Sequence, residues 1–130
     1  MGVMQLTSQI TFLYFDDLKR AKEFFTDTLG LEIVYDPGWA CVFRTGKGAY
    51  IGAVDAKGGS IEVGTRGGFL ISLTVNNIEE VWEDLNAKGL SVPEIKKVKE
   101  IALNSFIFTG PEGYKFEIQQ FTSGELRSIF

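Results

Sequence analysis

The chain has 130 residues, of which 17 are acidic and 13 are basic, so its net charge at neutral pH is −4. It contains no histidine and one cysteine, Cys41, which excludes histidine-dependent catalysis and an internal disulfide; a reducing cytoplasm is therefore expected. The lack of a basic patch argues against nucleic-acid binding, and no apolar run approaches the roughly 20 residues that span a membrane.

The first half of the chain reads as a strand, a helix and three more strands. An apolar, β-branched and aromatic run at Gln9–Phe15 predicts a buried strand. Asp16 and Asp17 then supply a helix N-cap, apolar residues recur at helical spacing, and Gly30 ends the helix. Three shorter strands are expected to follow, over Leu31–Tyr35, Trp39–Arg44 and Ala49–Asp55.

A glycine-rich connector, Ala56–Gly68, separates this half from a second half with the same order of elements. Phe69–Val75 is predicted to be a strand, Asn76 and Asn77 cap the next helix, and Gly89 ends it. A strand near Glu94–Lys99 is followed by a β-hairpin with strands at Ser105–Thr109 and Tyr114–Phe121.

The terminal hairpin turns through Gly110–Gly113, where Pro111 fixes its own φ and Gly113 supplies the freedom that a tight reversal needs. Because strand side chains alternate, Lys115, Glu117 and Gln119 share one face, which either contacts water or lines a cavity. The tail after the hairpin, Ser123–Phe130, is expected to form a helical turn that buries Leu126, Ile129 and Phe130.

The two halves also match each other in sequence. Phe15–Leu18 aligns with Val75–Ile78 at an offset of 60 residues (75 − 15). Aligning the turn glycines Gly48 and Gly113 places Gly52 on Glu117. A repeat of this kind indicates two similar units that pack together, each burying what its neighbour exposes.

Three stretches of the chain form a pattern of specific order and spacing: FDDLKRAKEFFTDTLGL (Phe15–Leu31), VNNIEEVWEDLNAKGL (Val75–Leu90) and GPEGYKFEI (Gly110–Ile118). This pattern resembles the vicinal oxygen chelate superfamily, which includes glyoxalase I, bleomycin-resistance proteins, extradiol dioxygenases and fosfomycin-resistance enzymes. The resemblance implies an α+β fold in which two βαβββ modules form a curled mixed sheet around a cavity, and a homodimer. It implies a single glyoxalase-like domain over residues 1–130, with modules at 9–55 and 69–121 and a linker at 56–68.

The metal enzymes of this superfamily place one ligand on the first strand and one on the last strand of each module. By resemblance, those positions fall on Ile10, Gly52, Leu70 and Glu117, and only Glu117 carries a donor atom. A transition metal needs three or four nitrogen, oxygen or sulfur ligands. We therefore expect no metal and no cofactor, and it stays open whether the chain is an enzyme.

The same alternation of side chains predicts which residues line the cavity. The expected ligand-binding residues are Ile10, Phe12, Tyr14, Tyr50, Leu70, Ser72, Lys115, Glu117 and Gln119. Val54 and Thr74 share this face, whereas the alignment does not fix the orientation of Trp39, Cys41 and Phe43. Apolar and aromatic walls with a few polar groups are typical of a small-molecule pocket, in which aromatic faces stack on flat ligands or hold cations.

These observations favour a metal-free protein, similar to the bleomycin-resistance branch, that binds an aromatic or cationic compound in the cavity. One alternative is a glyoxalase- or dioxygenase-like enzyme, a lyase or oxidoreductase, with a non-standard or absent metal and Glu117 as its base. The other alternative is a non-catalytic dimeric module whose cavity is vestigial.

Overall fold

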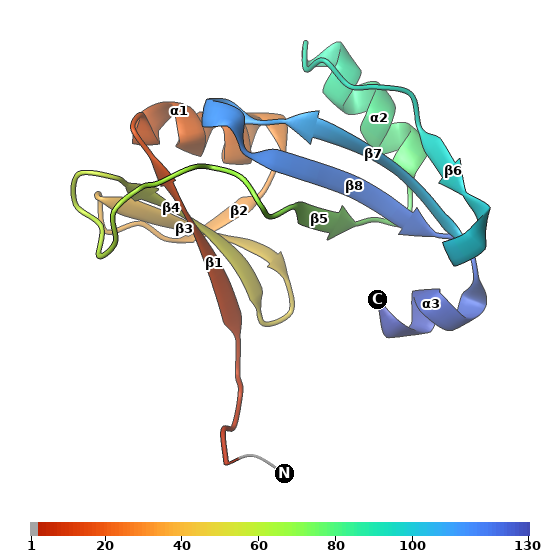
Figure 1. Cartoon of the computed structure of the whole chain (residues 1–130), viewed down its shortest axis with the longest axis horizontal. Helices are drawn as coiled ribbons and strands as arrows, with labels where there is room; N and C mark the ends of the chain where they lie inside the picture. The colour runs from red at the N-terminus through yellow and green to blue at the C-terminus, as the bar shows by residue number, and fades with distance from the viewer. Residues whose placement is uncertain (1–2) are drawn as a thin grey trace. The chain divides into compact units, whose positions relative to one another are not determined.

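A computed structural model describes residues 3–130 of the chain (Figure 1). The chain divides into two compact units, Met1–Thr65 and Arg66–Phe130, and the boundary lies inside the glycine-rich connector. Each unit holds one four-stranded mixed sheet together with helices, which confirms the predicted α+β class. In the part of the chain that the structure describes, no helix is both long and apolar enough to cross a membrane.

The first unit forms its sheet in the order β1-β4-β3-β2. β1 (Gln9–Phe15) and β4 (Ala49–Asp55) run parallel and have the predicted bounds. β3 (Ala40–Gly46) pairs antiparallel with β4 on one side and with β2 (Glu32–Tyr35) on the other. Helix α1 (Leu18–Glu23) follows β1 and continues into a π-helical turn at 24–28.

The second unit repeats this topology, with the sheet order β5-β8-β7-β6. Its first and last strands, β5 (Ile71–Thr74) and β8 (Lys115–Phe121), are again parallel, and β8 pairs antiparallel with β7 (Leu103–Thr109). The remaining elements are α2 (Ile78–Ala87), β6 (Lys96–Val98), short 3₁₀ turns at Lys99–Ile101 and Pro111–Gly113, and α3 (Gly124–Ile129). The common topology confirms the repeat read from the sequence.

The first helix begins as predicted but ends differently. The Asp17 carboxylate accepts a hydrogen bond from the backbone N–H of Arg20 at 3.1 Å, which confirms the N-cap. After Glu23 the helix widens into the π turn, where the N–H of Leu29 donates to the carbonyl of Phe24 at 3.0 Å. Both Phe24 and its neighbour Phe25 are buried in this turn, so the wider helix places two consecutive rings in the core.

The core of the first unit lies on the face of its sheet that the helix covers. Phe25 packs on Phe43 with ring centroids 4.9 Å apart and contacts Phe15 edge-on at 6.1 Å. Cys41 and Phe43 are fully buried on this face, opposite Ala53 and Ile51 in the β3–β4 register. The orientation of Cys41 and Phe43, which the sequence alignment did not fix, is therefore toward the helix and the core.

The core of the second unit is likewise aromatic and aliphatic. Phe116 is fully buried and stacks on Phe108 with ring centroids 5.6 Å apart, and Ile78 and Leu85 of α2 are buried as well. The start of α2 is held by a side chain that the sequence did not indicate, since the amide of Gln120 accepts from the N–H of Ile78 at 3.1 Å.

The predicted caps of α2 act differently from the prediction. Asn77 occupies the N-cap position, but its side chain donates to Glu80 at 2.9 Å and makes no capping bond to the backbone. The backbone carbonyl of Asn76 accepts from Gln120 Nε2 at 3.0 Å. Gln120 therefore takes the capping role that was predicted for the asparagines. Its side chain joins β8 to the start of α2 through these two hydrogen bonds.

The second unit differs from the prediction in further details. β5 is shorter than the predicted strand at both ends, so Leu70 lies just before the strand and is 42% exposed. The C-terminal helix forms with Ser123 as its N-cap, but Ile129 and Phe130 are 63% and 69% exposed. Their predicted burial is wrong, because Phe130 only stacks on Phe121 and leaves most of its ring uncovered.

Candidate functional site

Each sheet has one face that does not carry its unit's core, and the predicted site residues lie there or beside it. On the first sheet these residues, which we call the aromatic face, are Ile10, Phe12, Tyr14 and Tyr50. On the second sheet, the polar face comprises Ser72, Thr74, Lys115, Glu117 and Gln119. Val54 also belongs to the first of these faces by its register with Tyr14, but it is only 2% exposed. The alternation of strand side chains thus separates each core from a second surface.

Phe12 lies over Gly52 on the aromatic face. The two residues are partners in the parallel β1–β4 register. A Cβ atom added to Gly52 would come within 2.3 Å of Phe12 Cδ1 and 2.5 Å of Phe12 Cε1. One edge of the ring therefore occupies the space that any side chain at position 52 would need. The ring remains 49% exposed, and Ile10 beside it is 40% exposed.

Tyr14 is covered by the connector that follows β4. Its hydroxyl accepts a hydrogen bond from the backbone N–H of Ser60 at 3.1 Å. A Cβ atom on Gly59 would lie 2.1 Å from Tyr14 Cε2, so the connector backbone passes directly against the ring. Such an approach requires glycine at this point of the connector. The predicted role of Tyr14 in ligand contact stays a prediction, but part of its ring and its hydroxyl are used within the unit.

Tyr50 is engaged by a neighbouring arginine. The guanidinium of Arg44 donates to the Tyr50 hydroxyl at 3.3 Å and lies 5.6 Å from the ring centroid, within the range of a cation–π contact. Arg44 also donates to Glu32 at 2.8 Å, and this hydrogen bond is the main cause of the raised pKa of Arg44. Arg44 is therefore held beside the aromatic face, and its charge is compensated by Glu32.

The polar face is tied together across its strands. The Ser72 hydroxyl donates to Glu117 Oε1 at 2.5 Å, and Gln119 Nε2 donates to the Thr74 hydroxyl at 3.0 Å. Lys115 donates to Thr109 on the neighbouring strand at 2.5 Å. These bonds orient the amide and carboxylate side chains on the face, and they give Lys115 a hydroxyl partner across the β7–β8 pair.

The strand registers support the alignment of the two modules. Gly52 is opposite Phe12 in the first unit, and Glu117 is opposite Ser72 in the second. Residues 12 and 72 differ by 60, which is the offset that the helix starts gave independently. Position 52 therefore corresponds to position 117, and the equivalent places hold a phenyl ring over glycine in one unit and a hydroxyl bonded to a carboxylate in the other.

These residues do not fit a transition-metal site. Of the four positions that the superfamily uses for ligands, Ile10 and Gly52 in the first unit offer no donor atom, and Leu70 in the second offers none. Glu117 provides the remaining donor, and its Oε1 already accepts from Ser72. Over residues 3–130, no group of three or more cysteine, aspartate or glutamate side chains is placed to hold a metal ion. One carboxylate is insufficient for a stable site.

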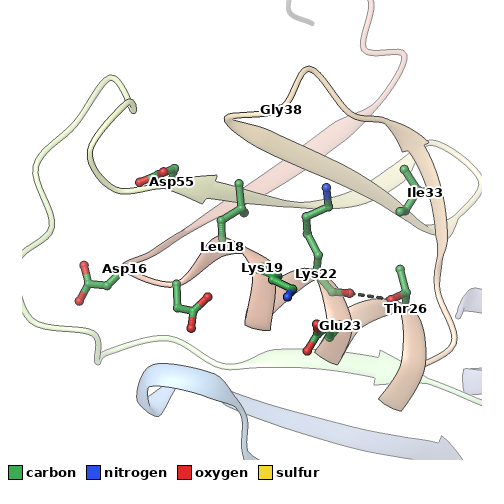
Figure 2. A pocket seen from close by; sticks show the side chains of 10 residues that line it. Asp16, Leu18, Lys19, Lys22, Glu23, Thr26, Ile33, Gly38 and Asp55 are labelled. Carbon is green, nitrogen blue, oxygen red and sulfur yellow. Dashed lines mark hydrogen bonds between the residues drawn. The ribbon is translucent and has the colours of Figure 1, made fainter.

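A separate hollow of about 680 Å³ lies in the first unit beside the start of α1. Figure 2 shows Asp16, Leu18 and Lys22 from the helix side of this hollow, with Gly38 and Asp55 contributed by the sheet and its loops. The sequence indicated Asp16 only as a possible helix cap, so it gave no signal for this hollow. The hollow is formed by segments that are distant in the chain.

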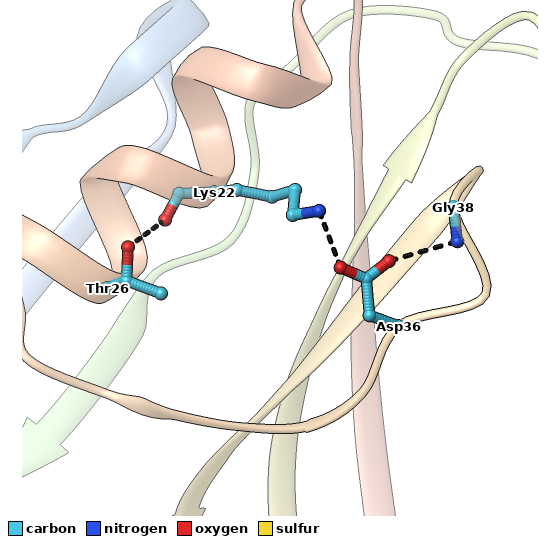
Figure 3. Close-up of polar contacts among 4 residues, drawn as sticks. All are labelled: Lys22, Thr26, Asp36 and Gly38. Atoms are coloured by element: carbon cyan, nitrogen blue, oxygen red, sulfur yellow. Dashed lines mark hydrogen bonds and ion pairs between the residues drawn. The ribbon is translucent and has the colours of Figure 1, made fainter.

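Lys22 spans part of this hollow to reach Asp36 (Figure 3). Its Nζ lies 2.6 Å from Asp36 Oδ2, and the backbone N–H of Gly38 donates to Asp36 Oδ1 at 3.0 Å. The hydrogen bond between these side chains is the main cause that raises the pKa of Lys22 and lowers the pKa of Asp36. The cation of Lys22 is thus paired within the protein. Nearby Cys41 is buried, and burial raises the pKa of its thiol, which makes it a poor nucleophile.

A comparison with models of known protein families agrees with the fold described above. The family model for the Glyoxalase/Bleomycin resistance protein/Dioxygenase superfamily matches residues 7–118. The chain belongs to this superfamily, and its ligand positions depart from the metal-binding pattern as described above. A comparison with curated protein sequences found no significant match.

Solved structures with the same fold include proteins of several activities. A lactoylglutathione lyase from Agrobacterium tumefaciens is 22% identical, with a TM-score of 0.71 over 90% of this chain and 92% of that one. A glyoxalase/bleomycin resistance protein/dioxygenase from Nocardioides is 20% identical, with a TM-score of 0.72 over 95% and 88%. A genomically encoded fosfomycin resistance protein from Listeria monocytogenes is 18% identical, with a TM-score of 0.68 over 95% and 99%. At these identities the likeness establishes the fold alone.

The approach of the connector to Tyr14 gives a stability prediction. Gly59→Ala should lower the free energy of unfolding by about 1–3 kcal/mol, because the added methyl group must displace the Tyr14 ring or the connector. Gly64→Ala is the matched control, since a Cβ atom at Gly64 meets nothing within 4 Å. Urea denaturation followed by circular dichroism measures both. Equal stabilities for the two variants would show that the connector does not rest on Tyr14.

The ion pair of Lys22 and Asp36 gives a prediction for the pH dependence of stability. The folded-state pKa of Asp36 is lowered, so its contribution is complete above the usual aspartate pKa of about 3.9 and is lost as the pH falls through the folded value. The raised pKa of Lys22 makes its contribution complete below the usual lysine pKa of about 10.4, and it is lost as the pH rises beyond the folded value.

The chain should therefore be more stable than its Asp36→Asn variant at neutral pH, and the difference should shrink on acidification below about pH 4. Urea titrations at several pH values measure this difference. Glu62→Gln removes one carboxylate from the exposed connector and should change the free energy of unfolding by less than about 0.5 kcal/mol. A difference between the chain and Asp36→Asn that persists undiminished at pH 2 would contradict the assignment.

Proposed function

We propose that this chain is a metal-free small-molecule-binding protein that binds an aromatic or cationic compound. The observation that carries the proposal is the lack of a donor at three of the four ligand positions of the superfamily. Ile10, Gly52 and Leu70 have no donor atom, and the exposed side chains of Ile10 and Phe12 lie on the same sheet face as Gly52. A scaffold that holds ligands through a metal in its relatives would here bind them through side chains alone.

The aromatic face supports binding of an aromatic compound. Phe12 and Ile10 are 49% and 40% exposed, and apolar surface at such a site gains roughly 25 cal/mol for each Å² that a ligand removes from water. An aromatic pair adds about 0.5–1.5 kcal/mol beyond the area term. Small-molecule sites usually combine such surface with a few fixed polar groups.

The polar face supports binding of a cationic group. The Glu117 carboxylate is oriented by its hydrogen bond from Ser72, and the nearest lysine on its strand, Lys115, is bonded to Thr109. A positively charged ligand would therefore meet a carboxylate that is already held in place. A hydrogen bond to a charged group contributes about 1.5–3 kcal/mol, which is enough to select cationic over neutral ligands.

Thermal-shift titration tests this function. Dose-dependent increases in melting temperature are expected with members of an aromatic library or an organic-cation library, because a ligand that binds only the folded state stabilises it by RT ln(1 + [L]/Kd). The Glu117→Gln variant should lose the response to cations and keep the response to neutral aromatic compounds. Flat curves for both libraries would contradict the proposal. Turnover of a methylglyoxal–glutathione adduct by the metal-free chain would instead favour the lyase alternative.

A further inference from the structure

We propose that the bound compound is planar and aromatic, that it stacks on the ring of Phe12, and that Gly52 is the positioning residue that allows this ring its place. This inference rests on the proposed function and names the ligand class for the aromatic face. It also assigns a role to a glycine that the superfamily pattern marks only as a lost ligand position.

The first step of the argument is steric. The Cδ1–Cε1 edge of the Phe12 ring fills the space over Gly52, where even a methyl group would approach within 2.3 Å. The strand register fixes this contact, because Phe12 and Gly52 are partners in the β1–β4 pair. A residue larger than glycine at position 52 would force the ring to rotate away from the sheet. The absence of a side chain at position 52 and the placement of the ring are therefore linked.

The second step is availability. Of the aromatic side chains on this face, Tyr14 is covered by the connector at Gly59, and Tyr50 is bonded to Arg44. Phe12 contacts the glycine backbone along one edge and is 49% exposed elsewhere. Its ring is therefore the aromatic surface that a ligand can reach with the least rearrangement. Backing by the strand also restricts its rotation, so little side-chain entropy remains to be lost on binding.

The third step is charge. Arg44 lies over Tyr50 on the same sheet face, and the carboxylate nearest to it, Glu32, is its ion-pair partner. The Glu32 carboxylate is therefore already paired with Arg44 and is not available to a ligand cation, whereas a neutral planar ring needs no charged partner. The aromatic face thus selects for planarity and apolar surface, and positive charge is not required there.

A matched pair of bicyclic probes separates planarity from apolar area. 2-Naphthol and decahydro-2-naphthol carry the same hydroxyl group on a flat and on a saturated skeleton. In calorimetric titrations the chain should bind 2-naphthol more tightly, by about twofold to tenfold, which corresponds to the extra stabilisation of an aromatic pair. Equal binding of the two probes would overturn the assignment of a planar ligand.

Variants at the two positions then locate the probe. Phe12→Leu keeps apolar volume but removes the ring, so it should weaken 2-naphthol binding about twofold to tenfold and affect the saturated probe less. Phe12→Tyr restores a ring and should restore the preference for the flat probe. Gly52→Ala should weaken 2-naphthol binding, and Phe12→Leu combined with Gly52→Ala should be no weaker than Phe12→Leu alone, since both act through one ring.

Gly64→Ala is the control, because it changes a glycine in open space in the connector. Its affinity for 2-naphthol should equal that of the unchanged chain, and circular dichroism should show that each variant is folded. Binding of 2-naphthol that is insensitive to Phe12→Leu and to Gly52→Ala would overturn the inference and leave the proposed function standing. If the chain binds cations through Glu117 but binds neither bicyclic probe, the inference is likewise overturned and the proposed function stands. Absence of binding to either bicycle and to organic cations would overturn both.

Discussion

The parallel pairing of the first and last strand of each module is the constraint on which the site depends. It sets residue 12 opposite residue 52 in one unit and residue 72 opposite residue 117 in the other. Because partners in a parallel pair project to the same side of the sheet, the chemistry of each site is decided by two residues at a time. Here the pairs are phenylalanine with glycine and serine with glutamate.

The two pairs account for the poor fit of these positions to a transition metal. A ring over Gly52 removes a ligand position and fills its space with apolar surface. The second unit keeps a carboxylate at the equivalent position, Glu117, which accepts a hydrogen bond from the Ser72 hydroxyl. Neither arrangement offers the converging donors that a transition metal requires. The two equivalent places in the repeat thus carry different side-chain chemistry.

Much of the fold could be predicted from local sequence patterns. The bounds of β1 and β4, the Asp17 cap and the repeated topology follow from apolar runs, capping residues and glycines. The π turn at 24–28, the capping of α2 by Gln120 and the orientation of Cys41 could not be predicted in this way. These features depend on contacts between residues far apart in the chain, or on how one strand aligns with the next.

The candidate site could likewise be predicted from the sequence only in part. Strand parity placed Phe12 and Glu117 on faces away from the cores, but it carried no information about their partners. The connector backbone against Tyr14 and the hollow beside α1 are formed by segments separated by many residues. A linear pattern identifies which side chains share a face, and it leaves undetermined which of them are already engaged within the protein.

Metal binding is the most direct test of the central claim that this scaffold works without a chelated ion. The chain, purified without chelator, would be dialysed against zinc, nickel or iron(II), and its metal content measured by inductively coupled plasma mass spectrometry beside that of Glu117→Ala. We predict metal well below one equivalent per chain and no difference between the two proteins. One tightly held metal per chain that disappears in the Glu117→Ala variant would contradict the account.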